Sequence, residues 1–196
     1  RLAGRFTWRG TVQDWALNLV DVQVALDGRP WPAVQGTLVV QRPEAVGQTA
    51  VSGSLSTLRL QDAQRLWMAL PLIWRQELSG EQLTAWGQNP VTGDLRDLAF
   101  AVQREADGTW NENHLAGRFE NLGWSALGVI PGMSGLTGSL RADQDGGWLR
   151  VAGDAVGFQY PDLFTKTWPK GKLESELRWE RDGPLWKLWS PEMRLE

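Results

Sequence analysis

Apolar and polar residues alternate over long stretches of this chain, with the period of two that is typical of β-strands with one apolar face. The residues that lie between the apolar positions are mostly Arg, Asp, Gln and Glu. The clearest apolar positions are Leu2, Phe6 and Trp8, then Val20, Val22, Val24 and Leu26, then Leu98, Phe100 and Val102, and finally Leu173, Leu177 and Trp179. The pattern predicts a sheet that is hydrophobic on one side and polar on the other.

Short segments with Asp-Gly or Gly-Gly separate many of these stretches. They are LDGRP at 26–30, EADGTW at 105–110, DQDGGW at 143–148 and ERDGPLW at 180–186. Glycine readily adopts the positive φ that tight hairpin turns need. We therefore expect neighbouring strands to be mostly antiparallel.

One pentapeptide, Leu-Ala-Gly-Arg-Phe, occurs twice, at residues 2–6 and 115–119. A looser form, with Gly flanked two residues away on both sides by apolar residues, is centred on Gly4, Gly36, Gly53, Gly93, Gly117 and Gly138. The intervals vary from 17 to 40 residues, which excludes a solenoid or propeller of fixed period. Glycine in a strand permits a bulge, a bend or a close approach of another backbone. Any single instance is equally consistent with a strand start after a turn, but together they favour a strongly twisted and curled sheet.

Residues 60–90 break the alternation and show helical spacing instead. Asp62 is a candidate cap for a first helix, and Pro71 should end or kink it. Ser79 and Gln82 fit a capping box for a second helix that ends near Trp86. We expect a short helical pair over about residues 62–86, packed on the sheet, and a loop or single helical turn over the Gly-rich and Pro-rich residues 121–135.

Composition adds few constraints to this picture. The net charge is −3 with both signs interspersed, which argues against nucleic acid as a partner. There is no cysteine, no apolar run of spanning length and no secretory leader within these residues. Because the chain lacks an initiator Met and enters the repeated motif at Leu2, we expect residues 1–196 to be a single β-groove segment from a much longer protein.

Motifs for nucleotide binding and nucleophilic catalysis are missing from the sequence. His114 is the single histidine, and its polar neighbours predict a solvated turn residue. Asp143 and Asp145 resemble the start of a calcium loop, but the bidentate carboxylate that should follow is absent, so a hairpin turn is the better interpretation. We expect no catalytic residues, no metal and no cofactor.

Paired acids for glycoside hydrolysis remain a distant alternative, because such pairs meet only in space. The acids near irregular segments with aromatic company are Glu112, Asp154 and Asp162. The thirteen tryptophans allow a sugar-stacking surface, an apolar trough or an ordinary core. Most of them fall in predicted strands or helices, which favours core or trough over a sugar platform.

Two long stretches resemble the AsmA-like superfamily, particularly its YhdP-like branch. The first begins LRLQDAQRLWMALPLIWRQELSG and continues through the Trp-bearing segment into VTGDLRDLAFAV. The second is LAGRFENLGWSALGVIPGMSGLTGSLRADQDGGWLRVAGDAVGFQYPDLF followed by GKLESELRWERDGPLWKLW. Together they cover most of residues 50–189.

The resemblance implies an inner-membrane-anchored periplasmic protein of Gram-negative bacteria, with an open β-trough that conducts phospholipid toward the outer membrane and supports its permeability barrier. It implies phospholipid acyl chains, neighbouring segments of the same full-length chain and possible envelope proteins as partners. The resemblance implies no catalytic residues.

From the residues we expect a mainly β fold, an antiparallel, strongly twisted and curled sheet that forms an open groove. The side chains expected to face the trough, chosen by alternation, are Phe6, Trp8, Val22, Val24, Leu38, Val40, Phe100, Val102, Phe119 and Leu140. Alternation alone leaves open whether this face meets lipid or the helices. The alternative function is a periplasmic scaffold or chaperone-like module in outer-membrane protein assembly, which would bind a partner strand at an open sheet edge.

Overall fold

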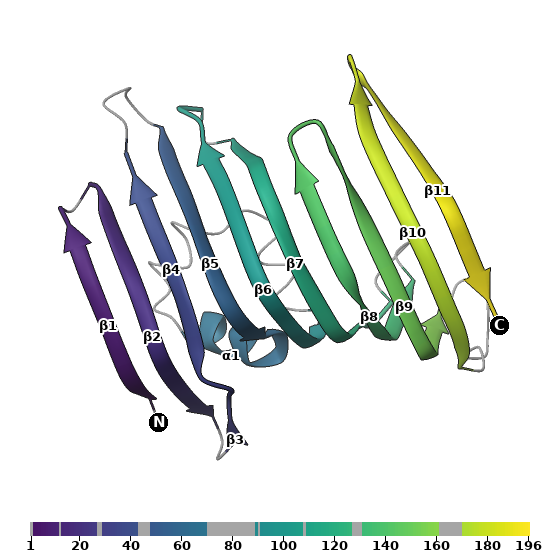
Figure 1. Ribbon diagram of the computed structural model, residues 1–196, viewed down its shortest axis with the longest axis horizontal. Coiled ribbons are helices and arrows are strands. Elements are labelled where there is room, and N and C mark those ends of the chain that lie inside the picture. Colours follow the sequence, from purple (N-terminus) through teal and green to yellow (C-terminus); the bar gives the residue numbers. More distant parts are fainter. Residues whose placement is uncertain are drawn as a thin grey trace.

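One large antiparallel sheet dominates the protein (Figure 1). The computed structural model describes residues 2–11, 13–26, 29–42, 48–69, 89, 91–107, 109–126, 131–160 and 170–196. Ten strands follow each other across the sheet in the order of the chain: β1 (Leu2–Gly10), β2 (Trp15–Leu26), β4 (Val34–Gln41), β5 (Thr49–Arg59), β6 (Val91–Arg104), β7 (Trp110–Trp124), β8 (Gly132–Asp143), β9 (Gly146–Gln159), β10 (Gly171–Asp182) and β11 (Leu185–Leu195). The two-residue strand β3 (Arg29–Pro30) pairs with β2 beside this path.

The sheet is open, because β1 pairs only with β2 along the path and β11 only with β10 among the described strands. The predicted mainly β, antiparallel fold is therefore confirmed. The turns predicted at EADGTW, DQDGGW and ERDGPLW join β6 to β7, β8 to β9 and β10 to β11. The centre of the LDGRP segment lies outside the described residues.

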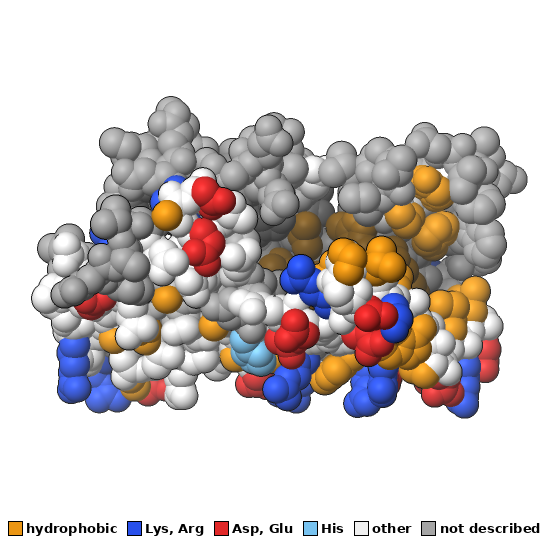
Figure 2. Space-filling model, turned by 90° about the horizontal axis from the view of Figure 1, so that it is seen from above, with side chains coloured by type: hydrophobic (Ala, Val, Ile, Leu, Met, Phe, Trp, Pro, Cys, Tyr) orange, Lys and Arg blue, Asp and Glu red, His pale blue; other side chains and the backbone are white. Residues whose placement is uncertain are grey.

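Lateral pairing divides the sheet into two faces. One row of direct partners crosses all ten strands and consists of Trp8, Leu17, Leu38, Gly53, Phe100, Leu115, Ala142, Gly147, Trp179 and Leu188. The adjacent row on the opposite side begins Thr7, Asn18, Thr37 and Ser54. Figure 2 shows the same division, with charged side chains along one side of the sheet and hydrophobic side chains in a hollow on the other. We call these sides the apolar face and the polar face.

Bulges interrupt the alternation along the strands, and three of those in the described residues hold a non-glycine residue with positive φ. The non-glycine residues with positive φ are Asp21, Asp97 and Asn121, and the strand register shifts at each of them. Each bulge inserts an extra residue and so reverses which side chains face inward beyond it. The uninterrupted alternation predicted over residues 20–26 is therefore wrong at Val20, which pairs with Arg5 on the polar face, while Val22 pairs with Val34 on the apolar face.

The repeated glycines have two structural roles. Gly4, Gly93 and Gly117 lie opposite the three bulges, against Asp21, Asn121 and the residues beside Asp97. Gly36, Gly53 and Gly138 lie in regular register, where a large side chain of the neighbouring strand occupies the space above them. The expected bulges and close approaches are thus both present, in different members of the repeat.

Sequence reasoning placed several boundaries wrongly. The helix α1 spans Leu60–Ala69, so Asp62 lies in its first turn and does not cap it. The predicted second helix lies outside the described residues. Residues 121–124 and 132–135 belong to β7 and β8, because bulges let these Gly-rich segments stay in the sheet. His114 lies within β7, half-buried between Ala101 and Asp143, and not in a turn.

Among the residues that the structure describes, the buried core is small. Phe119, Leu136 and Val156 form its centre, and Leu95, Leu122, Trp124, Met133, Leu149, Val151 and Leu173 pack around them. The accessible surface of 13387 Å² exceeds the roughly 9,300 Å² expected of a compact monomer of 21.9 kDa. The open sheet accounts for the excess, because the described residues outside it are few and include only one helix, α1.

Candidate functional site

The registers bring all ten predicted trough residues to the apolar face. Phe6 and Trp8 lie on β1, Val22 and Val24 on β2, Leu38 and Val40 on β4, Phe100 and Val102 on β6, Phe119 on β7 and Leu140 on β8. Their alternation in the sequence was sufficient to place them, because no extra residue separates two members that share a strand. The register shift between Ala101 and Val102 has its extra residue on β7. The site is therefore a broad surface and not a pocket with converging polar groups.

Exposure varies strongly across the apolar face. Phe119, in the middle of the sheet, is 3% exposed, whereas Phe6 and Trp8 on the edge strand β1 are 73% and 53% exposed. The opposite edge strand β11 is also open, with Leu188 at 66% and Met193 at 68%. The centre of the face is thus partly covered by its own side chains, and both margins are bare.

The sequence analysis missed part of the apolar face near the ends of β7, β8 and β9. Trp124 and Met133 are direct partners there, and they line a cavity of about 360 Å³ together with Gly132 and Gly157. The indole nitrogen of Trp124 donates a hydrogen bond to the carbonyl of Pro131 at 2.8 Å, which satisfies its polar group away from the sheet. Alternation could not reveal these residues, because the bulge at Asn121 shifts the pattern just before them.

The polar face carries ion pairs both between neighbouring strands and within one strand. Arg150 and Arg178 donate hydrogen bonds to the two carboxylate oxygens of Glu176, at 2.8 Å and 2.5 Å. These hydrogen bonds, that of Arg150 first, hold the pKa of Glu176 below its ordinary value. Such pairs keep this face charged and solvated, and they include no arrangement of nucleophile and base.

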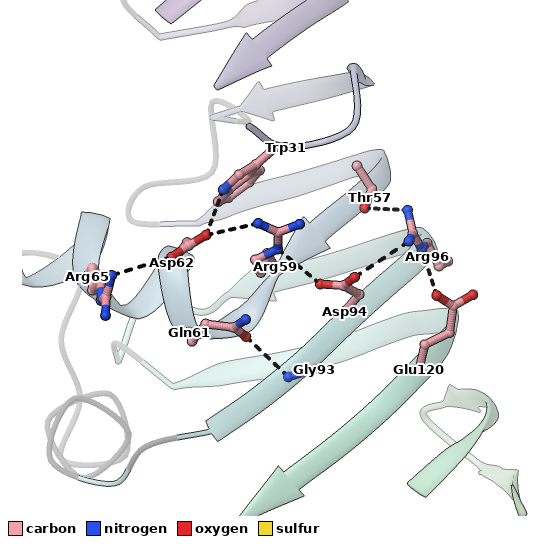
Figure 3. Close-up of polar contacts among 10 residues, drawn as sticks. All are labelled: Trp31, Thr57, Arg59, Gln61, Asp62, Arg65, Gly93, Asp94, Arg96 and Glu120. Atoms are coloured by element: carbon pink, nitrogen blue, oxygen red, sulfur yellow. Dashed lines mark hydrogen bonds and ion pairs between the residues drawn. The ribbon is translucent and has the colours of Figure 1, made fainter. Parts of the chain in front are cut away.

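A polar network anchors α1 at one end of β5 and β6 (Figure 3). The indole nitrogen of Trp31 donates to the buried carboxylate of Asp62 at 2.8 Å, and Asp62 lies 3.7 Å from Arg59. Arg59 in turn pairs with Asp94 on β6 at 3.5 Å. The buried carboxylate of Asp62 thus has partners on two sides, so its role is to hold α1 and the segment after β3 against the sheet.

The described residues contain no group of three or more His, Cys, Asp or Glu side chains that could hold a metal ion. Within the same part of the chain, no helix has the length and hydrophobicity needed to cross a membrane.

An open sheet with one continuous apolar face, and with bare margins at both edges, defines a β-groove protein. The comparisons agree with this class: the model of the YhdP protein family matches residues 1–196, and the chain belongs to that family. This membership agrees with the AsmA-like, YhdP-like resemblance seen in the sequence and is consistent with a lipid-transport-related protein of the cell envelope. No curated protein and no solved structure matches the chain.

Proposed function

We propose that the apolar face is a non-catalytic lipid-binding groove that contributes to phospholipid transport between the inner and outer membranes. The observation that carries the proposal is the apolar row that runs from Trp8 to Leu188 without a polar residue. Trp8 and Leu188, at the two ends of this row, are 53% and 66% exposed.

The energetics of lipid transfer favour such a surface. A 16-carbon acyl chain that leaves a bilayer exposes methylenes worth about 0.8 kcal/mol each, or about 12 kcal/mol per chain. A carrier lowers this barrier only if apolar surface is available along the whole path. The row of ten strands at a spacing of about 4.8 Å offers nearly 50 Å of such surface.

We place this groove in the periplasm, tethered to the inner membrane through the full-length protein and serving the permeability barrier of the outer membrane. Its partners would be phospholipid acyl chains, neighbouring segments of the same full-length chain and other envelope proteins, with no role for nucleic acid. Family membership supports this setting, and the division of the sheet into an apolar and a charged face is compatible with it.

A substitution in the middle of the face tests the proposal. Val102 lies on the apolar face opposite Val51, and the adjacent Ala101 lies on the polar face opposite Ser52 and His114. Val102→Asp should at least halve the phospholipid that copurifies with the protein, measured by native mass spectrometry and lipid extraction, without changing the β-sheet signal in circular dichroism. Ala101→Asp is the matched control and should leave lipid loading unchanged.

Three results would contradict the groove. They are a wild-type protein that carries no lipid, a folded Val102→Asp variant that carries as much lipid as wild type, and loss of folding in Val102→Asp, which would place Val102 in an ordinary core. The open edges of β1 and β11 favour a second candidate, a scaffold that adds a strand from an outer-membrane protein. A lipid-free protein that binds unfolded barrel peptides would support the scaffold.

A further inference from the structure

A tryptophan lies among arginines on the polar face of the sheet. Trp148 on β9 has Arg141 of β8 as its direct partner on one side and Arg178 of β10 on the other. Arg150, two residues further along β9, stacks over the indole, with its Cζ 5.0 Å from the ring centroid. Direct partners on one face of an antiparallel pair bring their Cβ atoms to about 4.5–5.5 Å. Three guanidinium groups therefore surround one indole ring.

One carboxylate holds two of these arginines in place. Glu176 on β10 accepts hydrogen bonds from Nε of Arg150 at 2.8 Å and from Nε of Arg178 at 2.5 Å. Its side chain is much less exposed than those of the two arginines. The terminal nitrogens of Arg150 and Arg178 have no hydrogen bond to another residue that the structure describes. Both guanidinium groups are thus fixed at Nε, and their Nη donors face solvent.

The arginine cluster, formed by Arg141, Trp148, Arg150, Glu176 and Arg178, has a surplus of positive charge. Arg141 is exposed, and it has no ion pair or hydrogen bond with any residue in the described part of the chain. The cluster contains three arginines and one glutamate, so its net charge is +2, in a chain whose net charge is −3. Ion pairing between strands accounts for Glu176 and its two partners but not for Arg141.

The other carboxylates around the arginine cluster have partners of their own. They are Glu192 with Arg194 at 2.7 Å, Glu180 with Lys187 at 3.8 Å, Glu174 with Lys172 at 3.5 Å, and Asp143 with the backbone nitrogens of Asp145 and Gly146, each at 3.1 Å. These interactions leave the surplus charge of the cluster uncompensated within the described residues.

We propose that the arginine cluster is a binding site for a phosphate group. Guanidinium groups present planar pairs of N–H donors that match the oxygens of phosphate. Donors that are already held in place lose less conformational freedom when a ligand binds. The hydrogen bonds of Arg150 and Arg178 to Glu176, and the stacking of Arg150 on Trp148, hold them in this way. The ligand class is a phosphomonoester or phosphodiester, carried either by a lipid headgroup or by a soluble phosphorylated compound.

The site is independent of what adjoins the sheet and of the proposed function. β8, β9 and β10 each pair with a strand on both sides, so further strands beyond β1 or β11 would leave the cluster as it is. Figure 2 shows charged side chains along the side of the sheet that lies away from the hydrophobic hollow. The phosphate site therefore lies on the opposite face from the proposed lipid groove and does not rest on lipid binding there.

Calorimetric titration with inorganic pyrophosphate in a low-salt buffer tests the proposal. Wild type should bind the probe, with an affinity that falls as salt is added. Arg141→Gln should weaken binding about fivefold or more without changing the circular dichroism spectrum, because Arg141 has no partner to lose. Arg178→Gln should weaken binding by at least as much. Arg5→Gln is the matched control, since it removes the same charge from the polar face on β1, and it should bind like wild type.

Sedimentation with vesicles distinguishes the two sources of the phosphate. Wild type that sediments with phosphatidylcholine vesicles containing phosphatidylglycerol, when Arg141→Gln does not, would assign the site to lipid headgroups. Pyrophosphate binding without sedimentation would assign it to a soluble phosphorylated compound. Three results would overturn the proposal: wild type that does not bind pyrophosphate, a folded Arg141→Gln variant that binds as tightly as wild type, and an Arg5→Gln variant that loses as much affinity as Arg141→Gln.

Discussion

The two copies of Leu-Ala-Gly-Arg-Phe build the same local structure in two different surroundings. In each copy the glycine lies opposite a bulge on the neighbouring strand, and the arginine pairs with the aspartate of positive φ in that bulge: Arg5 with Asp21, and Arg118 with Asp97. The first copy lies before its bulged strand in the chain, and the second lies after it. The two pentapeptides therefore form similar pairs with a bulged strand, although Gly4 has a positive φ and Gly117 does not.

The final phenylalanines of the two copies have opposite environments. Phe119 is 3% exposed, because β8 lies beside it and Gly138 leaves room for its ring. Phe6 is 73% exposed, because β1 has a neighbour on one side only. Local sequence thus determines the bulge and its ion pair, whereas position in the sheet determines burial.

The two copies should differ most in the free energy of unfolding that is lost when each phenylalanine is replaced by alanine. Phe119→Ala should lower the free energy of unfolding by about 3–5 kcal/mol, because it leaves a cavity among packed side chains. Phe6→Ala should change it by less than about 0.5 kcal/mol, since an exposed side chain loses little burial. Urea titrations followed by circular dichroism measure both, and equal losses would show that the β1 edge is covered in solution.

Glycines of the repeat provide the next test. A methyl group on Gly138 would lie 2.0 Å from the backbone oxygen of Arg150 and 2.6 Å from Cζ of Phe119, whereas on Gly117 its nearest neighbours lie at an ordinary 3.5 Å. Gly138→Ala should therefore cost about 1–3 kcal/mol through overpacking. Gly117→Ala is the matched control and should be neutral or stabilising by up to about 1 kcal/mol. A harmless Gly138→Ala would mean that neither the Arg150 backbone nor the Phe119 ring approaches the glycine this closely.

Much of this arrangement follows from sequence pattern, because alternation with period two is a local property. It placed all ten trough residues, from Phe6 to Leu140, on one face. It failed at Val20 and before Trp124, because a bulge depends on an Asp or Asn adopting positive φ, and pattern gives no sign of that choice. The partnership of each Leu-Ala-Gly-Arg-Phe with an aspartate on another strand was likewise invisible, because the pairing order of strands emerges only in the fold.

Replacement of the bulge aspartates should lower the free energy of unfolding by less than the Phe119 and Gly138 substitutions do, and by the same amount in both copies. Asp21→Ala and Asp97→Ala should each cost about 1 kcal/mol, because alanine tolerates the left-handed region poorly and the arginine pair is lost. The corresponding glycine variants should be close to neutral, since glycine adopts positive φ without strain. Unfolding midpoints of the four variants measure this. Losses that differ between the copies by more than about 1 kcal/mol would show that the two bulges are not equivalent.

The smallest effect should come from Glu176, an ion-pair residue that does not have a positive φ. Its pKa in the folded protein lies below the ordinary value of about 4.3, so the stabilisation is complete above that pH and is lost as the pH falls through the lower folded value. Glu176→Gln removes the charge, so its difference in unfolding midpoint from wild type should be small at pH 7 and should vanish once the pH lies below the lowered pKa of Glu176. The group is solvated, so the difference should stay below that of either bulge aspartate. A Glu176 effect at pH 7 as large as that of Asp97→Ala would show that arginine pairing, and not backbone conformation, accounts for what the two pentapeptide copies share.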